Sequence, residues 1–125
     1  MSLMQTALQG YGRPEGPVRS PRRIEYDLLA RATQRLGGAW ARRAHDFPAL
    51  AAALAENQRL WSAFAADVAG PGNGLPAALR ARLFYLHEFT AQHSRKVLDG
   101  QGSVAVLVDI NTAVMRGLRG DEGAA

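Results

Sequence analysis

The chain has 125 residues, of which 47% are hydrophobic and 21% are charged, and it contains no cysteine. These values are typical of one globular domain with its own core. They exclude disorder throughout the chain, a disulfide framework, a cysteine zinc site and thiol catalysis.

The net charge of +4 is concentrated near the amino terminus. Residues 1–46 hold eight arginines against four acidic residues, whereas residues 47–125 hold seven basic and seven acidic residues. Such an asymmetry indicates a surface for nucleic acid or for an acidic partner. No apolar run approaches the ~20 residues of a membrane span, and the first residues lack the pattern of a secretory signal. We therefore expect a cytoplasmic protein without membrane insertion.

The first predicted helix follows a segment rich in glycine and proline. Glycine, proline and arginine occur in quick succession over residues 9–21, so we expect residues 1–19 to form a flexible or partly helical arm. Ser20-Pro21 then predicts a helix start, because serine is a favoured cap and proline suits the first helical position. Apolar residues follow at helical spacing, which predicts a helix at about residues 21–43.

Two further helices are delimited by caps and helix breakers. Asp46 begins the second predicted helix, and Gly70-Pro71 end it. The third runs from Leu75-Pro76 to about Asp99 and is closed by Gly100. Because few residues join these two helices, they should pack antiparallel. Their apolar seams comprise Phe47, Leu50, Leu54, Asn57, Trp61, Phe64 and Val68 on the second helix, and Leu75, Leu79, Leu83, Leu86, Thr90, His93 and Val97 on the third.

The last apolar segment, residues 104–118, has a β-branched start that would suit a buried strand. Its apolar residues Leu107, Ile110, Val114 and Leu118 nevertheless recur every three or four residues, and no other segment offers a strand to pair with. We therefore expect a helix. The predicted fold class is all-α: a compact bundle of about four main helices with a short basic amino-terminal arm. The helical domain should cover residues 20–119, followed by a disordered tail over residues 120–125.

The residue patterns that catalysis or metal binding would need are missing. His87 and His93 are six residues apart, about 240° around a helix, so they point to different sides. The GPGNG turn at residues 70–74 lacks the lysine and the strand–loop–helix setting of a phosphate loop. We find no carboxylate pair or Glu-x-x-His motif. We expect a protein that is not an enzyme, with no catalytic residue, cofactor, metal or small-molecule substrate.

Asn57 is a polar residue on the otherwise apolar seam of the second predicted helix. Two interpretations are open: a buried amide that fixes register by bonding to a neighbouring helix, or a polar contact with a partner in a groove. Trp61, four residues later on the same face, is either a core residue or a binding hot spot. The pattern favours the core interpretation for both residues.

Arg19, Arg22 and Arg23 lie close to Tyr26 at the start of the first predicted helix. Arginine and tyrosine together bind RNA by phosphate pairing and base stacking. The alternative is a solvated helix start, which the absence of an RNA-binding fold signature favours. Arginine near a helix amino terminus opposes the helix dipole, and this small cost indicates a role toward a partner.

Short sequence blocks occur in order along the chain: residues 20–28 (SPRRIEYDL), 57–61 (NQRLW) followed by Asp67, 73–80 (NGLPAALR), 109–111 (DIN) and 115–118 (MRGL). Together they resemble the FlaF family, regulators of flagellar biosynthesis found in alphaproteobacteria. The resemblance covers roughly residues 18–118. It implies a cytoplasmic, non-enzymatic factor that supports flagellin synthesis and secretion, in some members as a flagellin-binding chaperone. It also implies a partner regulator, FlbT, which affects flagellin messenger RNA.

Two functional hypotheses follow from the residues and the resemblance. In the first, an apolar groove of the bundle holds an amphipathic helix of flagellin. Its expected anchors are Leu60, Trp61, Phe64 and Met115, with Arg22, Asn57 and Asn111 as polar contacts. In the alternative, Arg22, Arg23 and Tyr26 bind flagellin messenger RNA and regulate its translation.

Overall fold

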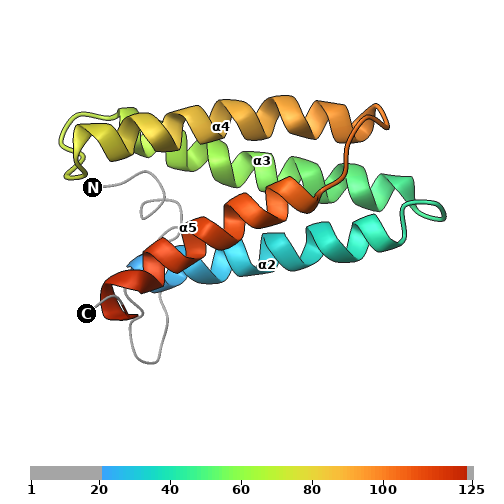
Figure 1. The fold of residues 1–125 in the computed structure, drawn as a ribbon, viewed down its shortest axis with the longest axis horizontal. Coiled ribbons are helices and arrows are strands. Elements are labelled where there is room, and N and C mark those ends of the chain that lie inside the picture. Colours follow the sequence, from blue (N-terminus) through green and yellow to red (C-terminus); the bar gives the residue numbers. More distant parts are fainter. Residues whose placement is uncertain (1–20, 124–125) are drawn as a thin grey trace, which may run out of the picture.

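Four α-helices make up most of residues 21–123, the part of the chain that the computed structural model describes (Figure 1). They are α2 (Pro21–Ala41), α3 (Phe47–Ala69), α4 (Ala77–Leu98) and α5 (Ala105–Gly123). No strand occurs among these described residues. The prediction of an all-α bundle of four main helices is therefore confirmed. The predicted amino-terminal arm, residues 1–19, lies outside the described residues.

Local sequence signals set both ends of α3. The Asp46 side chain accepts a hydrogen bond from the Ala49 amide at 3.1 Å, and a proline stands in the first turn. At the other end, the Gly70 amide donates to the Asp67 carbonyl. These caps satisfy backbone groups that have no partner inside a helix. Both lie where the sequence predicts them.

Asn73 organises the connection between α3 and α4. Its Nδ2 donates to the Asp67 carbonyl at 3.2 Å, and its Oδ1 accepts from the Leu75 amide at 3.0 Å. The short connection places α4 antiparallel to α3, as predicted (Figure 1). Gly100 follows α4 with a φ of 76°, a left-handed conformation that favours glycine just beyond a helix end.

The last segment is a helix, as predicted, and it is longer than expected. The Ser103 side chain accepts from the Ala105 amide at 3.1 Å at the start of α5. The helix then continues to Gly123, past residue 119, where the sequence suggested that the domain ends. No proline follows Gly117 to interrupt the backbone hydrogen bonds, so the local sequence does not stop the helix there.

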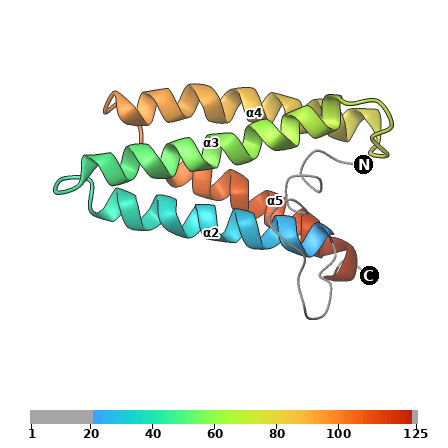
Figure 2. The ribbon, with the colours of Figure 1, turned by 180° about the vertical axis from the view of Figure 1, so that it is seen from behind.

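The helices pack as a series of neighbours in the order α4, α3, α2, α5 (Figures 1 and 2). α5 packs mainly on α2 and meets α4 only weakly. It starts beside the carboxyl-terminal end of α4 and runs toward the amino-terminal end of α2 (Figure 1). α4 and α5 therefore separate along the length of the bundle. None of the described helices is long and apolar enough to cross a membrane.

The core lies where α2, α3 and the start of α5 meet the end of α4. Its cluster of buried side chains consists of Leu36, Ala39, Leu50, Ala53, Leu54, Val97, Val104 and Leu107. The predicted seam of α3 is largely buried, although Phe47 in its first turn is exposed. Of the seam predicted for the third helix, only Thr90 and Val97 are fully buried, whereas Leu79 and also Leu75, which lies before the start of α4, are exposed. That part of the seam prediction is wrong because α5 turns away before it reaches the first half of α4.

Two glycines provide a test of the helix assignments. Gly37 lies on the exposed side of α2, and a Cβ added there would meet no atom within 4 Å. Gly37→Ala should therefore raise the free energy of unfolding by about 0.5–1 kcal/mol, because alanine lowers the entropy of the unfolded chain. Gly100→Ala should instead lower it by about 1 kcal/mol, because of the positive φ. Urea unfolding followed by circular dichroism measures both, and equal signs for the two variants would contradict these assignments.

Candidate functional site

A buried side-chain network joins three of the helices. Asn111 on α5 accepts a hydrogen bond from Trp61 Nε1 at 2.9 Å through its Oδ1. Its Nδ2 donates to Asn57 Oδ1 at 2.8 Å and to Thr33 Oγ1 at 3.1 Å. Thr33 in turn donates to the Leu29 carbonyl on α2 at 2.7 Å. Three helices far apart in the sequence therefore share one amide group.

This network supports the first of the two interpretations of Asn57. The side chain is fully buried and bonds to a neighbouring helix, as a register-fixing amide does. Trp61 is also fully buried, and its indole N–H has the partner that a buried indole requires. One group of the network, Asn57 Nδ2, is buried without a hydrogen-bond partner. The hydrogen bonds of the network thus specify one arrangement of the three helices, although they leave one buried donor without a partner.

Three of the predicted partner contacts belong to this network and have no accessible surface. Asn57, Trp61 and Asn111 are each 0% exposed. A partner therefore cannot reach them in this conformation, and their interactions are those of the core. Sequence periodicity indicated their face of the helix, but it did not show that α5 covers that face.

The other predicted anchors are partly accessible. Leu60 and Phe64 on α3 and Met115 on α5 are half-buried. The Phe64 ring packs edge-on against the Trp61 ring, with the centroids 5.6 Å apart and an angle of 84° between the planes. Partner binding by these three residues stays a prediction, since each side chain also contributes to the packing of the bundle.

The predicted basic cluster is only partly described. The side chain of Arg22 lies outside the described residues, as does Arg19. Arg23 is exposed, and its Nε lies 3.4 Å from the Asp27 carboxylate one helical turn later. Tyr26 is half-buried. The negative charge of Asp27 thus partly offsets the positive charge of Arg23, so Arg23 attracts a phosphate group less strongly.

The two candidate metal-binding histidines have different neighbours. His87 Nε2 lies 3.3 Å from Ser62 Oγ on α3, whereas His93 Nε2 lies 2.8 Å from the Ser103 carbonyl beyond α4. They therefore do not converge. Within residues 21–123, no group of three or more histidine or acidic side chains is placed to hold a metal ion.

The surface that the sequence did not predict is the first half of α4. Leu79, Leu83 and Leu86 share one helix face with the buried Thr90 and Val97. Leu79 is 40% exposed, and the other two leucines are half-buried. Among the described helices, α5 lies beside the buried end of this face and has moved away from its other end. We call Leu79, Leu83 and Leu86 the α4 leucine face.

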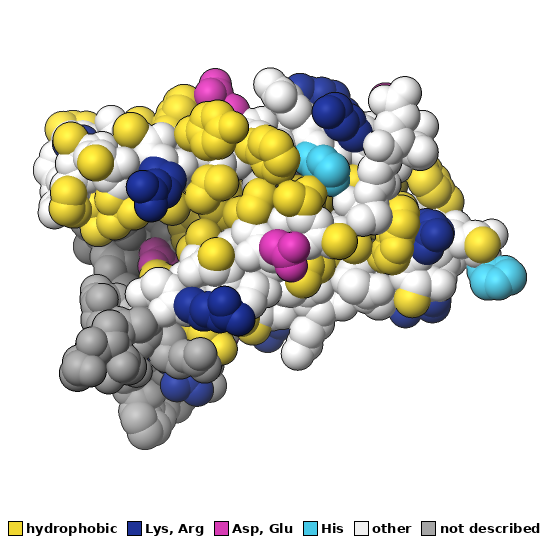
Figure 3. Space-filling model, in the orientation of Figure 1, with side chains coloured by type: hydrophobic (Ala, Val, Ile, Leu, Met, Phe, Trp, Pro, Cys, Tyr) yellow, Lys and Arg dark blue, Asp and Glu magenta, His cyan; other side chains and the backbone are white. Residues whose placement is uncertain are grey.

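Aromatic side chains extend the apolar surface of α4. Phe84 and Tyr85 are exposed, and Tyr85 keeps 62% of its surface accessible. Hydrophobic side chains gather over α4 and along its separation from α5 in the space-filling view (Figure 3). The sequence carried a signal for this surface: the run Leu83-Phe84-Tyr85-Leu86 places large apolar side chains around the whole helix, so one neighbour cannot bury them all.

Comparison with known proteins identifies a family. The chain matches the family model described as flagellar protein FlaF over residues 7–118. The match covers most of the chain and includes α2, α3, α4 and most of α5. No curated protein and no solved structure matches the chain significantly.

The buried network predicts a large penalty for losing the α5 amide. Asn111→Ala removes the acceptor of Trp61 Nε1 and the donor to Asn57 Oδ1, so it should lower the free energy of unfolding by roughly 2–4 kcal/mol. Thr112→Ala is the matched control, because Thr112 bonds only to the Val108 carbonyl of its own helix. It should cost less than about 1 kcal/mol. Equal penalties in urea unfolding would show that the network does not hold the bundle together.

Proposed function

The chain belongs to the FlaF family of flagellar proteins, and we propose that it binds flagellin as a chaperone-like factor in flagellin synthesis and secretion. The observation that carries this proposal is the α4 leucine face, a strip of accessible apolar side chains on a helix that has one main neighbour. Monomeric proteins rarely leave a contiguous apolar surface uncovered without a binding role. The proposed activity is binding, and it assigns no chemical step to the chain.

The spacing of the leucines supports an amphipathic helix as the ligand. Leu79, Leu83 and Leu86 are separated by four and three residues, the same spacing that apolar anchors have on an amphipathic helix. A helix laid beside α4 would interdigitate with them and take the place that α5 leaves open. The resemblance implies that the terminal segments of flagellin are amphipathic and disordered before assembly, which makes them the proposed ligand.

The anchors of this proposal differ from those expected from the sequence. Trp61, Asn57 and Asn111 hold α5 in place and so define the opening, whereas the α4 leucine face makes the contact. Leu60, Phe64 and Met115 are accessible in part and remain secondary candidates. Binding of FlbT and a cytoplasmic location are further proposals, which rest on the family resemblance alone.

A charge substitution on the α4 leucine face tests the proposal. Leu79→Asp places a carboxylate where an apolar anchor should sit, so the dissociation constant for flagellin should rise roughly tenfold or more. The control is Leu98→Asp, since Leu98 is also 40% exposed but lies at the opposite end of the same helix. It should change the dissociation constant less than about twofold. Isothermal titration of the purified proteins measures both.

The same titration distinguishes the protein partner from RNA. The wild-type protein is titrated with flagellin and with the leader region of flagellin messenger RNA at near-physiological salt. Binding of flagellin that Leu79→Asp weakens and Leu98→Asp preserves supports the proposal. If the protein bound RNA but not flagellin, and the RNA binding depended steeply on salt, the flagellin-binding proposal would be wrong and the alternative, a translational regulator that binds RNA, would take its place. Equal effects of the two leucine substitutions on flagellin binding would remove the α4 leucine face from the proposal.

A further inference from the structure

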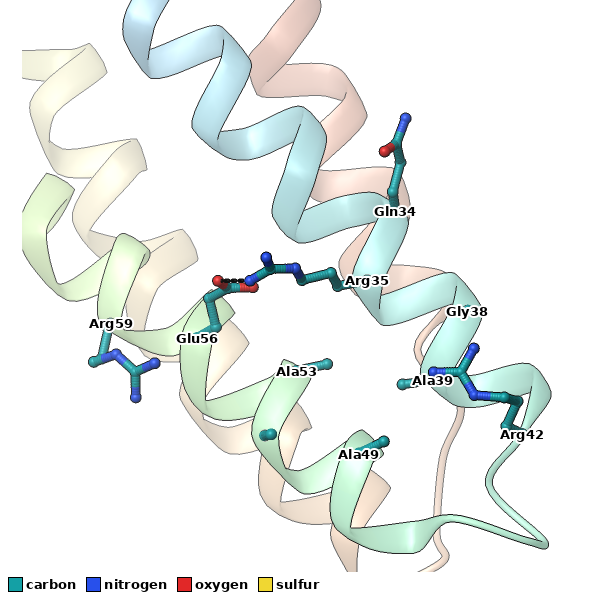
Figure 4. A pocket seen from close by; sticks show the side chains of 10 residues that line it. Gln34, Arg35, Gly38, Ala39, Arg42, Ala49, Ala53, Glu56 and Arg59 are labelled. Atoms are coloured by element: carbon teal, nitrogen blue, oxygen red, sulfur yellow. Dashed lines mark hydrogen bonds and ion pairs between the residues drawn. The ribbon is translucent and has the colours of Figure 1, made fainter.

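A hollow of about 580 Å³ lies between α2 and α3 (Figure 4). Its floor consists of small residues: Gly38 and Ala39 on α2, and Ala49, Ala52 and Ala53 on α3. The side chains of Ala39, Ala49 and Ala53 point into the space between the two helices (Figure 4). They are too short to fill the groove between the helices, which explains why the surface is hollowed there.

An ion pair connects the two walls of the hollow. Arg35 on α2 reaches across to Glu56 on α3, with one guanidinium nitrogen bonded to the Glu56 carboxylate (Figure 4). The pair links the two helices at this point, and the small residues lie on one side of it (Figure 4).

The rim of the hollow is positively charged. Three arginines and one glutamate line it, and Arg35 is already paired with that glutamate. Arg42 lies just beyond the end of α2, and Arg59 extends from α3 on the side away from α2 (Figure 4). Both are exposed, and neither forms an ion pair within the described part of the chain. The excess positive charge of the sequence contributes here, because residues 28–45 contain four arginines and no acidic residue.

We propose that this hollow binds an acidic peptide segment of a protein partner. An apolar side chain of the segment packs on the alanine floor, and carboxylates on either side of it pair with Arg42 and Arg59. Arginine suits this role, because its planar guanidinium group binds a carboxylate through two parallel hydrogen bonds. The combination of an apolar floor and a cationic rim matches an amphipathic segment of negative charge.

The side chains of the hollow favour a protein ligand over a nucleic acid. Single-stranded RNA is held by phosphate pairing together with stacking of bases on aromatic rings. None of the residues that line the hollow is aromatic. The nearby Trp40 has one face covered by Arg43, whose guanidinium carbon lies 3.8 Å from the centre of the indole ring. A base therefore finds no free stacking surface in the hollow, whereas an aliphatic side chain finds a floor that fits it.

The hollow is independent of the proposed flagellin site. It lies beside the first half of α3, whereas the α4 leucine face lies beside the last half of α3. The two surfaces differ in charge as well, since one is rimmed by arginine and the other is a row of leucines. The two surfaces together allow the bundle to hold two segments at once.

The test uses a fluorescein-labelled synthetic peptide in which glutamates flank a central leucine at helical spacing. Fluorescence anisotropy with the full-length protein should show binding that weakens as salt is added. Ala52→Leu fills the hollow and leaves every charge in place, so it should weaken binding roughly tenfold. Ala55→Leu is the matched control, because Ala55 is an exposed alanine of α3 that does not line the hollow. It should leave binding unchanged.

A second pair of variants tests the charged rim. Replacing both Arg42 and Arg59 by glutamine should weaken binding about tenfold, whereas Arg95→Gln, at an exposed position of α4, should have little effect. Circular dichroism confirms that each variant is folded. Equal binding by the Ala52→Leu and Ala55→Leu variants would overturn the proposal, because any basic surface would then suffice. Tighter binding of a single-stranded RNA probe at the same arginines would also overturn it, in favour of a nucleic-acid site.

Discussion

The buried side-chain amide of Asn111 is the interaction on which the arrangement of the bundle depends. It bonds to Trp61 and Asn57 on α3 and to Thr33 on α2, so one group determines how α5 lies on two other helices. An apolar residue at this position would allow α5 to slide or rotate at little cost. The hydrogen bonds instead penalise every placement that leaves the indole or an amide without a partner.

The position of α5 determines which surfaces remain for partners. Because α5 is held against α2 and α3, it diverges from α4, and among the described helices α3 is the one main neighbour of α4. On the far side of α3, the hollow exists because the facing residues of α2 and α3 are small. α3 is therefore the scaffold between two surfaces of different chemistry.

Helix ends and fold class follow from the sequence because their causes are local. Asp46, Gly70 and Gly100 act within one turn of their own helices, and the structure has them where the pattern predicts. The environment of a seam residue depends instead on a helix far away in the chain. Periodicity places Leu79 and Asn57 on apolar faces, yet one is exposed and the other fully buried, because α5 covers only the second. The hollow was not predicted either, since alanine and glycine carry no periodic signal of what surrounds them.

The dependence of α4 on a single main neighbour has a consequence for its dynamics. With fewer buried contacts along its first half, that segment should open at a lower free energy than α3, and its amide hydrogens should exchange with solvent sooner. A ligand seated on the α4 leucine face would supply the missing contacts and suppress this opening. Binding would then stabilise the folded protein in proportion to the logarithm of ligand concentration. The melting temperature of the bundle would then rise with the concentration of such a ligand.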